Sequence, residues 1–413
     1  MPRMIRPVLA ATLAATFSLA ACAQTRDETC LTSLREAARA QGMARADAER
    51  LTRGWTPEWA VLDNLDNQPE FKTPIWDYLA ALVDDQRIAD GRAQLAAHKA
   101  TLADIEQRFG VDAATVVAVW GVESNFGQVL GGRPIVASLA ALACEGRRQS
   151  YFRGEWLALA KLMATGDLDT SGPEGATAIK GSWAGAFGQT QFMPSTYQRL
   201  AVDFDADGRR DLITSTPDAL ASTANFLVKG GWRMGQPWGY EVRLPAGFDA
   251  GDAGRRDKQP LATWAARGVT PVAGGKLTGD GPAALLLPAG REGPAFLVLR
   301  NFDVIYGYNA AESYALAIAH LADRLRGGGP FAAPWPTDDA GLSRAERREV
   351  QTLLAARGHA VGAPDGLIGP ATRAAVRTEQ QARGWPQDGR PGQKLLRTLR
   401  AEPAPAAASA TAP

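Results

Sequence analysis

Apolar residues in this chain recur mostly at helical spacing, and the clearest run lies before residue 121. Asp112 favours the N-cap position of a helix, and the residues from there to Trp120 are almost all apolar. The pattern predicts a buried helix that ends between Gly121 and Gly127, since glycine is common where helices end. Glu123 would then lie near the C-terminal end of this helix.

A second set of helices is predicted near the C-terminus. Ser343 can cap a helix in which Val350, Leu353 and Leu354 share one face. A turn rich in Gly and Pro separates it from another helix through Val376.

Residues 242–299 interrupt the helical pattern, because they are rich in Gly, Pro and Val. Within them, Ala295 to Leu299 is an apolar run that predicts a strand. The expected fold class is therefore mainly α, in the α+β sense, with a small β-containing insertion and a small C-terminal helical domain.

Length and composition indicate a globular chain with more than one domain. With 413 residues, 46% hydrophobic residues and a formal charge of +1, it can bury a large core, and nothing indicates binding to nucleic acid. Residues 327–341 are rich in Gly and Pro and predict a linker. Residues 342–401 would form the C-terminal domain, and the Pro- and Ala-rich tail 402–413 is expected to be disordered.

The N-terminus has the layout of a bacterial export signal. Two arginines precede an apolar stretch that ends at Ala21 and is too short to span a membrane as a stable helix. The four residues ending at Cys22 resemble a lipobox, so residues 1–21 would be a signal peptide and Cys22 the lipidated first residue. Cleavage near Ala23 without a lipid is the alternative. Because Ala23 is not the Asp that retains lipoproteins in the inner membrane, we expect a periplasmic protein anchored to the inner face of the outer membrane.

The remaining cysteines agree with export. With Cys22 acylated, Cys30 and Cys144 form an even pair in an oxidising compartment. We expect one disulfide between them, and two buried free thiols are the alternative.

Glu123 is the leading candidate for catalysis. Desolvation against Trp120 and Phe126 and the negative end of the helix dipole should both raise the pKa of its carboxyl. A carboxylic acid that stays protonated near neutral pH can donate its proton to a glycosidic oxygen. A salt-bridged or exposed glutamate at a helix end is the alternative.

Two further segments support a sugar-cleaving site. Residues 182–197 mix small residues with aromatics and amides, and residues 301–315 combine Asn with three tyrosines. Together with residues 120–127, in this order, they resemble the membrane-bound lytic murein transglycosylase B family. The resemblance covers about residues 28–326 and implies a lysozyme-like catalytic domain over residues 22–326.

The resemblance also implies a set of site residues. Glu123 matches the single catalytic acid and base of the family. The family's polar and aromatic residues that line the glycan cleft are matched by Ser182, Gln191, Tyr308, Asn309 and Tyr314. An arginine pair that the family associates with the peptide stem of the substrate is matched by Arg147 and Arg148. The alternatives are that the two tyrosines are core aromatics and that the arginines form a solvated basic helix end.

The implied reaction needs neither a second carboxylate nor a cofactor. One glutamate protonates the leaving oxygen of the β-1,4 bond between N-acetylmuramic acid and N-acetylglucosamine in peptidoglycan. It then accepts the proton of the muramic C6 hydroxyl as that group attacks C1, which leaves a 1,6-anhydromuramic end. A hydrolytic muramidase and a non-catalytic peptidoglycan-binding lipoprotein are the competing functions. Exo and endo cleavage are both compatible with the sequence.

An acidic loop follows the second segment. Three aspartates alternate before Gly208, as in the calcium loop of an EF-hand, although Thr214 stands at the twelfth position where a glutamate is expected. The resemblance implies that a later aspartate closes a lengthened loop. The predicted positions of a structural Ca²⁺ site are Asp203, Asp205, Asp207, Arg209 and Asp218. A solvated acidic turn without an ion is the alternative.

The C-terminal domain resembles the three-helix peptidoglycan-binding domain through its Asp-Gly-x-x-Gly-Pro-x-Thr turn, residues 365–372. Residues 342–400 hold eleven Lys and Arg against five Asp and Glu, and the net charge of +6 would attract the carboxylates of peptide stems. The expected partners are peptidoglycan strands and, by analogy, cell-wall synthesis proteins. A soluble helical domain without this role is the alternative.

Overall fold

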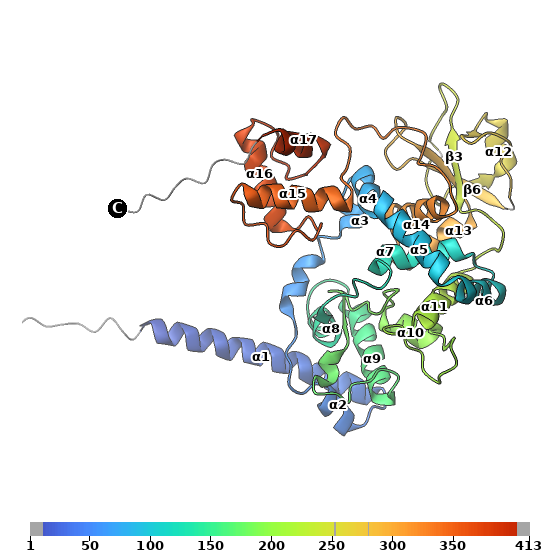
Figure 1. Ribbon diagram of the computed structural model, residues 1–413. Coiled ribbons are helices and arrows are strands. Elements are labelled where there is room, and N and C mark those ends of the chain that lie inside the picture. The colour runs from blue at the N-terminus through green and yellow to red at the C-terminus, as the bar shows by residue number, and fades with distance from the viewer. Residues whose placement is uncertain (1–10, 252, 280, 403–413) are drawn as a thin grey trace, which may run out of the picture. The chain divides into compact units, whose positions relative to one another are not determined.

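The computed structural model describes residues 11–251, 253–279 and 281–402, with side chains from Thr25 onward. Residues 1–10 of the predicted signal peptide, the Cys22 side chain and the tail from residue 403 lie outside the described residues. No helix within the described part is long and apolar enough to cross a membrane. The chain divides into two compact units (Figure 1), one containing Met1–Gln68 and Gly127–Asn225 and the other Pro69–Phe126 and Phe226–Pro413.

The first unit is helical apart from one pair of very short strands. Its elements are α1 (Ala11–Ala40), α2 (Arg45–Leu51), the 3-10 helix η1 (Trp59–Asn64), β1 (Arg133–Pro134), α8 (Ile135–Cys144), α9 (Gln149–Thr165), the 3-10 helix η2 (Gly175–Ala178), β2 (Lys180–Gly181), α10 (Pro194–Leu200) and most of α11 (Thr216–Lys229). Cys30 in α1 and Cys144 at the end of α8 are joined by a disulfide that closes a separation of 114 residues.

The second unit holds the predicted buried helix. Its helices before the C-terminal domain are α3 (Pro69–Lys72), α4 (Ile75–Leu82), α5 (Asp85–Ala97), α6 (Lys99–Phe109), α7 (Ala113–Ser124), α12 (Leu261–Ala266), α13 (Arg300–Asn309) and α14 (Glu312–Leu325). Asp112 caps α7, because its carboxylate accepts a hydrogen bond from the Thr115 N–H at 3.0 Å. Asn125, with a left-handed φ of 51°, ends the helix. The predicted helix and its N-cap are confirmed.

The helix α7 packs closely at Gly121. A Cβ atom at this position would lie 2.6 Å from the ring of Phe126 and 3.4 Å from the side chain of Leu321 in α14. The first distance is below any real Cβ contact, so the local packing depends on glycine here.

The insertion between α11 and α13 is a sheet. Its strands are β3 (Gly239–Arg243), β4 (Lys258–Pro260), β5 (Thr270–Pro271), β6 (Pro282–Leu286) and β7 (Ala295–Val298), in the order β4-β6-β7-β3-β5 with every pair antiparallel. Gly239 pairs with Val298 in the central ladder. Trp264 is fully buried in the core of the sheet and donates to the Ala283 carbonyl oxygen at 2.9 Å. The β-containing insertion and its last strand were therefore predicted correctly.

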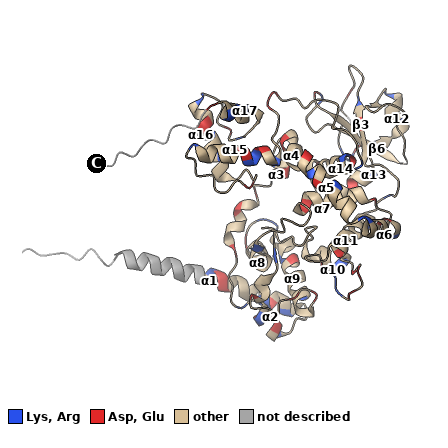
Figure 2. Cartoon of the chain, viewed as in Figure 1, with Lys and Arg blue, Asp and Glu red and all other residues tan. Residues whose placement is uncertain are grey.

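The C-terminal domain has three helices, α15 (Arg344–Ala356), α16 (Pro370–Ala382) and α17 (Gln393–Ala401). Ser343 and Glu346 form a capping box at the start of α15, which confirms the predicted cap. Val350, Leu354 and Leu396 are fully buried in its core. Lys and Arg lie interspersed with Asp and Glu along the helices of both units (Figure 2).

Candidate active site

Glu123 lies in the last turn of α7 with a half-buried side chain. Its carboxylate oxygen Oε1 accepts a hydrogen bond from the hydroxyl of Tyr314 in α14. Tyr314 is 3% exposed, so this polar pair is largely removed from water. The partner of Glu123 is thus a neutral donor, which argues against the salt-bridged alternative.

Burial raises the pKa of Glu123 from its ordinary 4.5 to about 8. The hydrogen bond from Tyr314 acts in the opposite direction, whereas the negative charge of Glu70 raises the pKa further. Tyr314 keeps its proton, because burial and the nearby Glu123 charge hold its own pKa well above the usual range. At neutral pH the site therefore presents a protonated carboxyl beside a phenol.

Two neighbours of Glu123 were missed by the sequence reasoning. The negative charge of Glu70 in α3 helps to raise the pKa of Glu123. The pKa of Tyr78 in α4 is raised by burial and by the charges of Glu70 and Glu123. The backbone carbonyl of Glu70 accepts the Ser313 hydroxyl at 2.7 Å, which ties α3 to the start of α14. Glu70 stands in a polar stretch of ordinary composition, so no sequence pattern pointed to it.

Tyrosine rings form one side of this site. Tyr308 in α13 stacks on Tyr314 with ring centroids 6.4 Å apart, and the ring of Phe226 lies 4.5 Å from that of Tyr308. Asn309 is exposed, and its amide lies 3.5 Å from the Glu70 carboxylate. The structure thus gathers Tyr308, Asn309 and Tyr314 with Glu123 in one unit.

A pocket of about 780 Å³ opens beside these residues. Its lining includes Glu70, Trp76, Tyr306 and Ser313. Glu123 does not line it, but Glu70, whose charge acts on Glu123, does.

The other predicted substrate residues belong to the first unit. Ser182 Oγ accepts the Ala186 N–H at 3.0 Å, and Gln191 donates from its amide to the carbonyl oxygens of Leu130 and Gly188 at 3.1 and 2.8 Å. These bonds fix the two side chains on a tight turn. Gln191 itself adopts a left-handed φ of 51°.

The two arginines are exposed and already have local partners. Arg147 pairs with Asp66 at 3.2 Å and also donates to the Leu65 carbonyl oxygen. The Arg148 guanidinium lies over the ring of Tyr151 at 4.3 Å.

The acidic loop brings together three of its predicted ligands. Carboxylate oxygens of Asp203, Asp205 and Asp218 lie within 4.8 Å of one another. Asp207 is outside this group, and its carboxylate accepts the Arg209 N–H at 2.8 Å. Asp203 Oδ1 is buried and has no hydrogen-bond partner among the described residues.

The profile of the transglycosylase SLT domain family matches residues 26–323. The chain belongs to this family. The resemblance found in three sequence motifs is thereby confirmed. Residues 343–399 of this SLT-family chain also match the profile of a peptidoglycan binding domain.

Named relatives agree with this assignment. Membrane-bound lytic murein transglycosylase B of Escherichia coli is 36% identical over 226 residues, which make up 53% of this chain and 58% of that protein. The chain therefore spans less than two thirds of the length of this curated relative.

Solved structures share the fold. SltB3 from Pseudomonas aeruginosa, in complex with NAG-anhNAM-pentapeptide, has 48% identity and a TM-score of 0.71 and covers 90% of this chain and 99% of that chain. Slt35 from Escherichia coli, in complex with calcium, has 30% identity and a TM-score of 0.62 and covers 72% of this chain and 92% of that chain.

Proposed function

We propose that this SLT-family protein is a lytic transglycosylase. It cleaves the β-1,4 bond between N-acetylmuramic acid and N-acetylglucosamine in peptidoglycan without consuming water, and Glu123 is its single acid and base. The observation that carries the proposal is the half-buried Glu123 carboxyl, which has a pKa of about 8 and a neutral tyrosine as its partner. The anhydro sugar bound by SltB3 is of the kind that this reaction would form.

The raised pKa accounts for both proton transfers. At neutral pH, Glu123 holds the proton that the leaving glycosidic oxygen needs. Once that proton is given away, the buried carboxylate is a stronger base than an ordinary glutamate and readily takes the proton of the C6 hydroxyl. The C6 oxygen then bonds to C1, and the enzyme regains its starting state. Tyr314 stabilises the transient carboxylate through its hydrogen bond.

The remaining predicted site residues would orient the substrate. Tyr308 offers a stacking surface and Asn309 an exposed amide on the same unit as Glu123. Ser182 and Gln191 would contact the glycan, and the exposed arginines 147 and 148 would contact stem carboxylates.

Analysis of released muropeptides tests the proposal. Sacculi treated with the full chain should yield products with anhydro ends, detected by mass spectrometry. Glu123→Gln should release nothing while its circular dichroism spectrum is unchanged, and the matched variant Glu70→Gln should keep anhydro products. Turnover by Glu123→Gln would remove Glu123 from its proposed role.

Glu70 gives hydrolysis some support as a second candidate, because a second carboxylate close to the acid is what muramidases use. A hydrolytic enzyme would release reducing ends. It would also lose activity in Glu70→Gln.

We further propose that the acidic loop binds Ca²⁺ and that the ion has a structural role. The clustered carboxylates fit a cation that prefers oxygen ligands, and the unsatisfied Asp203 Oδ1 is the kind of atom that an ion would occupy. Asp203, Asp205 and Asp218 would hold the ion. Calcium titration calorimetry on wild type and Asp203→Asn should show binding only to wild type.

The chain's ends would place the enzyme at the cell wall. We propose that residues 1–21 are a signal peptide and that Cys22 carries the lipid that anchors the protein to the outer membrane from the periplasm. Cys22→Ala should then move the protein from the membrane fraction to the soluble periplasmic fraction. Residues 342–401, after the 327–341 linker, would bind peptidoglycan and bring the catalytic domain, 22–326, to its substrate. Proteins of cell-wall synthesis are the expected partners.

A further inference from the structure

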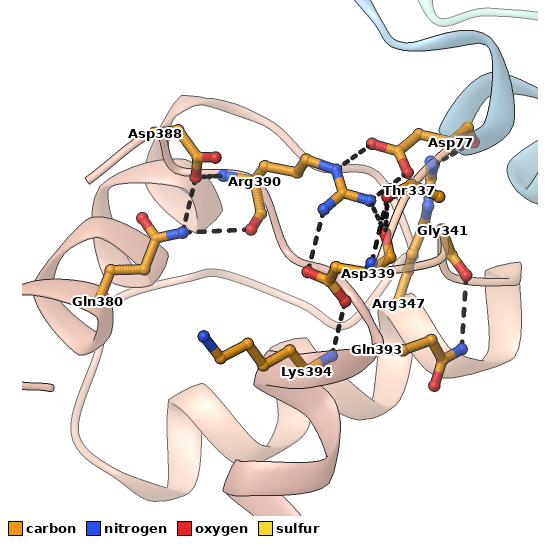
Figure 3. A network of polar contacts seen from close by, with 10 residues as sticks. All are labelled: Asp77, Thr337, Asp339, Gly341, Arg347, Gln380, Asp388, Arg390, Gln393 and Lys394. Atoms are coloured by element: carbon orange, nitrogen blue, oxygen red, sulfur yellow. Dashed lines mark hydrogen bonds and ion pairs between the residues drawn. The ribbon is translucent and has the colours of Figure 1, made fainter. Parts of the chain in front are cut away.

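Within the second unit, the C-terminal domain contacts α4 through an ionic network (Figure 3). Arg390 donates to both carboxylate oxygens of Asp77, at 2.6 and 2.8 Å, and to Asp339 at 3.0 Å. Asp77 is 6% exposed, and Gly341 packs so closely that a Cβ there would lie 2.8 Å from the Asp77 Cα. Bidentate pairs of this kind fix orientation as well as distance.

A second contact lies at the first residue of α15. Arg344 donates from its backbone N–H and its Nε to Asp84 Oδ2, at 3.2 and 3.1 Å. Its Nη1 also donates to the side-chain oxygen of Asn125. The Arg344 side chain is 15% exposed and that of Asp84 4%, so this contact is mostly shielded from water.

Asn125 and Asp84 connect Arg344 to the end of the helix that carries Glu123, the first directly and the second through α5. Asn125 is the left-handed residue that closes α7. Asp84 caps α5 by accepting the Arg87 N–H at 2.7 Å, and the Arg87 guanidinium donates to the Gly121 carbonyl oxygen at 2.9 Å. The arginine therefore reaches the last turn of α7 by two routes, one direct and one through α5.

We propose that Arg344 is a positioning residue for catalysis. It holds the last turn of α7, and with it the Glu123 carboxyl, where the acid meets the glycosidic oxygen. The inference rests on the proposed role of Glu123. A left-handed Asn is a sparsely populated backbone state that needs support from its surroundings, and the charge-assisted bond from Arg344 contributes to that support. The domain expected to bind the wall thus also completes the catalytic helix.

Steady-state kinetics of the full chain on soluble glycan strands test this. Arg344→Ala should lower kcat about tenfold with little change in KM, because a small displacement of a catalytic group costs rate more than binding. Arg344→Lys should not restore kcat, since one ammonium cannot hold Asp84 and Asn125 together.

Arg390→Ala is the matched control. It removes an arginine from the same domain contact but none of the bonds to α7, so kcat should stay at the wild-type level. If Arg344→Ala and Arg390→Ala lose equal kcat, the rate depends on the contact of the C-terminal domain as a whole and not on the bonds of Arg344 to α7. That result would overturn the inference.

Asn125→Gly supplies a second, independent measurement. Glycine accepts the left-handed backbone and removes the side-chain acceptor of the direct route, so Arg344→Ala should cost less kcat in this background than in the wild type. Fully additive losses would overturn the inference. If Glu123→Gln is inactive and Arg344→Ala is fully active, only the role of Arg344 is overturned. If Glu123→Gln is active, the proposed function is overturned together with the role of Arg344.

Discussion

Glu123→Gln should stabilise the folded protein at neutral and alkaline pH while it abolishes catalysis. The carboxyl of Glu123 has a pKa of about 8 in the folded protein and an ordinary value of 4.5 without the fold. Between these two values the unfolded chain has released this proton and the folded chain still holds it. The stability of the wild type must therefore fall as pH rises through this window. Glutamine does not titrate, so the variant escapes this loss.

The size of the effect follows from the two pKa values. Each pH unit between them is worth about 1.4 kcal/mol, so the difference in unfolding free energy between variant and wild type grows to about 5 kcal/mol above pH 8. At about pH 7 roughly 3 kcal/mol of it should be present, and near pH 4 almost none. Glutamine can still accept the Tyr314 hydrogen bond, so this contact does not offset the gain.

Urea unfolding of both proteins at about pH 4, pH 7 and pH 8 measures the difference. All other titrating groups are shared, so their contributions cancel when the two unfolding free energies are subtracted. A difference that stays constant across this range would show that Glu123 titrates normally, and the argument for a protonated acid would fail.

Other changes have equally definite outcomes. Tyr314→Phe removes a hydrogen bond that lowers the pKa of Glu123, so the alkaline limb of the pH–rate profile should move up by about one pH unit. Glu70→Gln removes a negative charge that raises this pKa, so the same limb should move down. Shifts in the same direction for the two variants would contradict this account. Cys30→Ser opens the disulfide and should cost about 4 kcal/mol of unfolding free energy, and reductant should then have no further effect on thermal unfolding. Removal of Ca²⁺ with a chelator should lower the melting temperature of the wild type but not that of Asp203→Asn, and equal responses would exclude an ion in the loop.

Local patterns predicted the elements well. Asp112 and the apolar run after it fixed the start of α7, and Ser343 fixed the start of α15, because caps act on backbone groups only a few residues away. The burial of Glu123 followed from its position in an apolar helix. The expected direction of the pKa shift agrees with the structure, and the sequence pattern did not predict the hydrogen bond from the Tyr314 hydroxyl.

Long-range contacts between polar residues could not be predicted in this way. Glu70 affects Glu123, and Glu123 affects Tyr78, because α3 and α4 pack against α14, which carries Tyr314, and no local sequence pattern marks this packing. The pair of Arg390 and Asp77 joins positions 313 residues apart, and charge alone does not select such partners. Family resemblance supplied Tyr314 where no periodicity would have singled it out.

Gly121 shows how a residue without a functional group can matter to the surroundings of the acid. The packing of α7 at this point leaves no room for a methyl group, and α14, which borders it through Leu321, also carries Tyr314. We expect an alanine there to push against the Phe126 ring and so to disturb the turn that follows Glu123. A mutant screen scored on cell-wall turnover should then detect substitutions at this position, although glycine has no side chain to take part in the reaction.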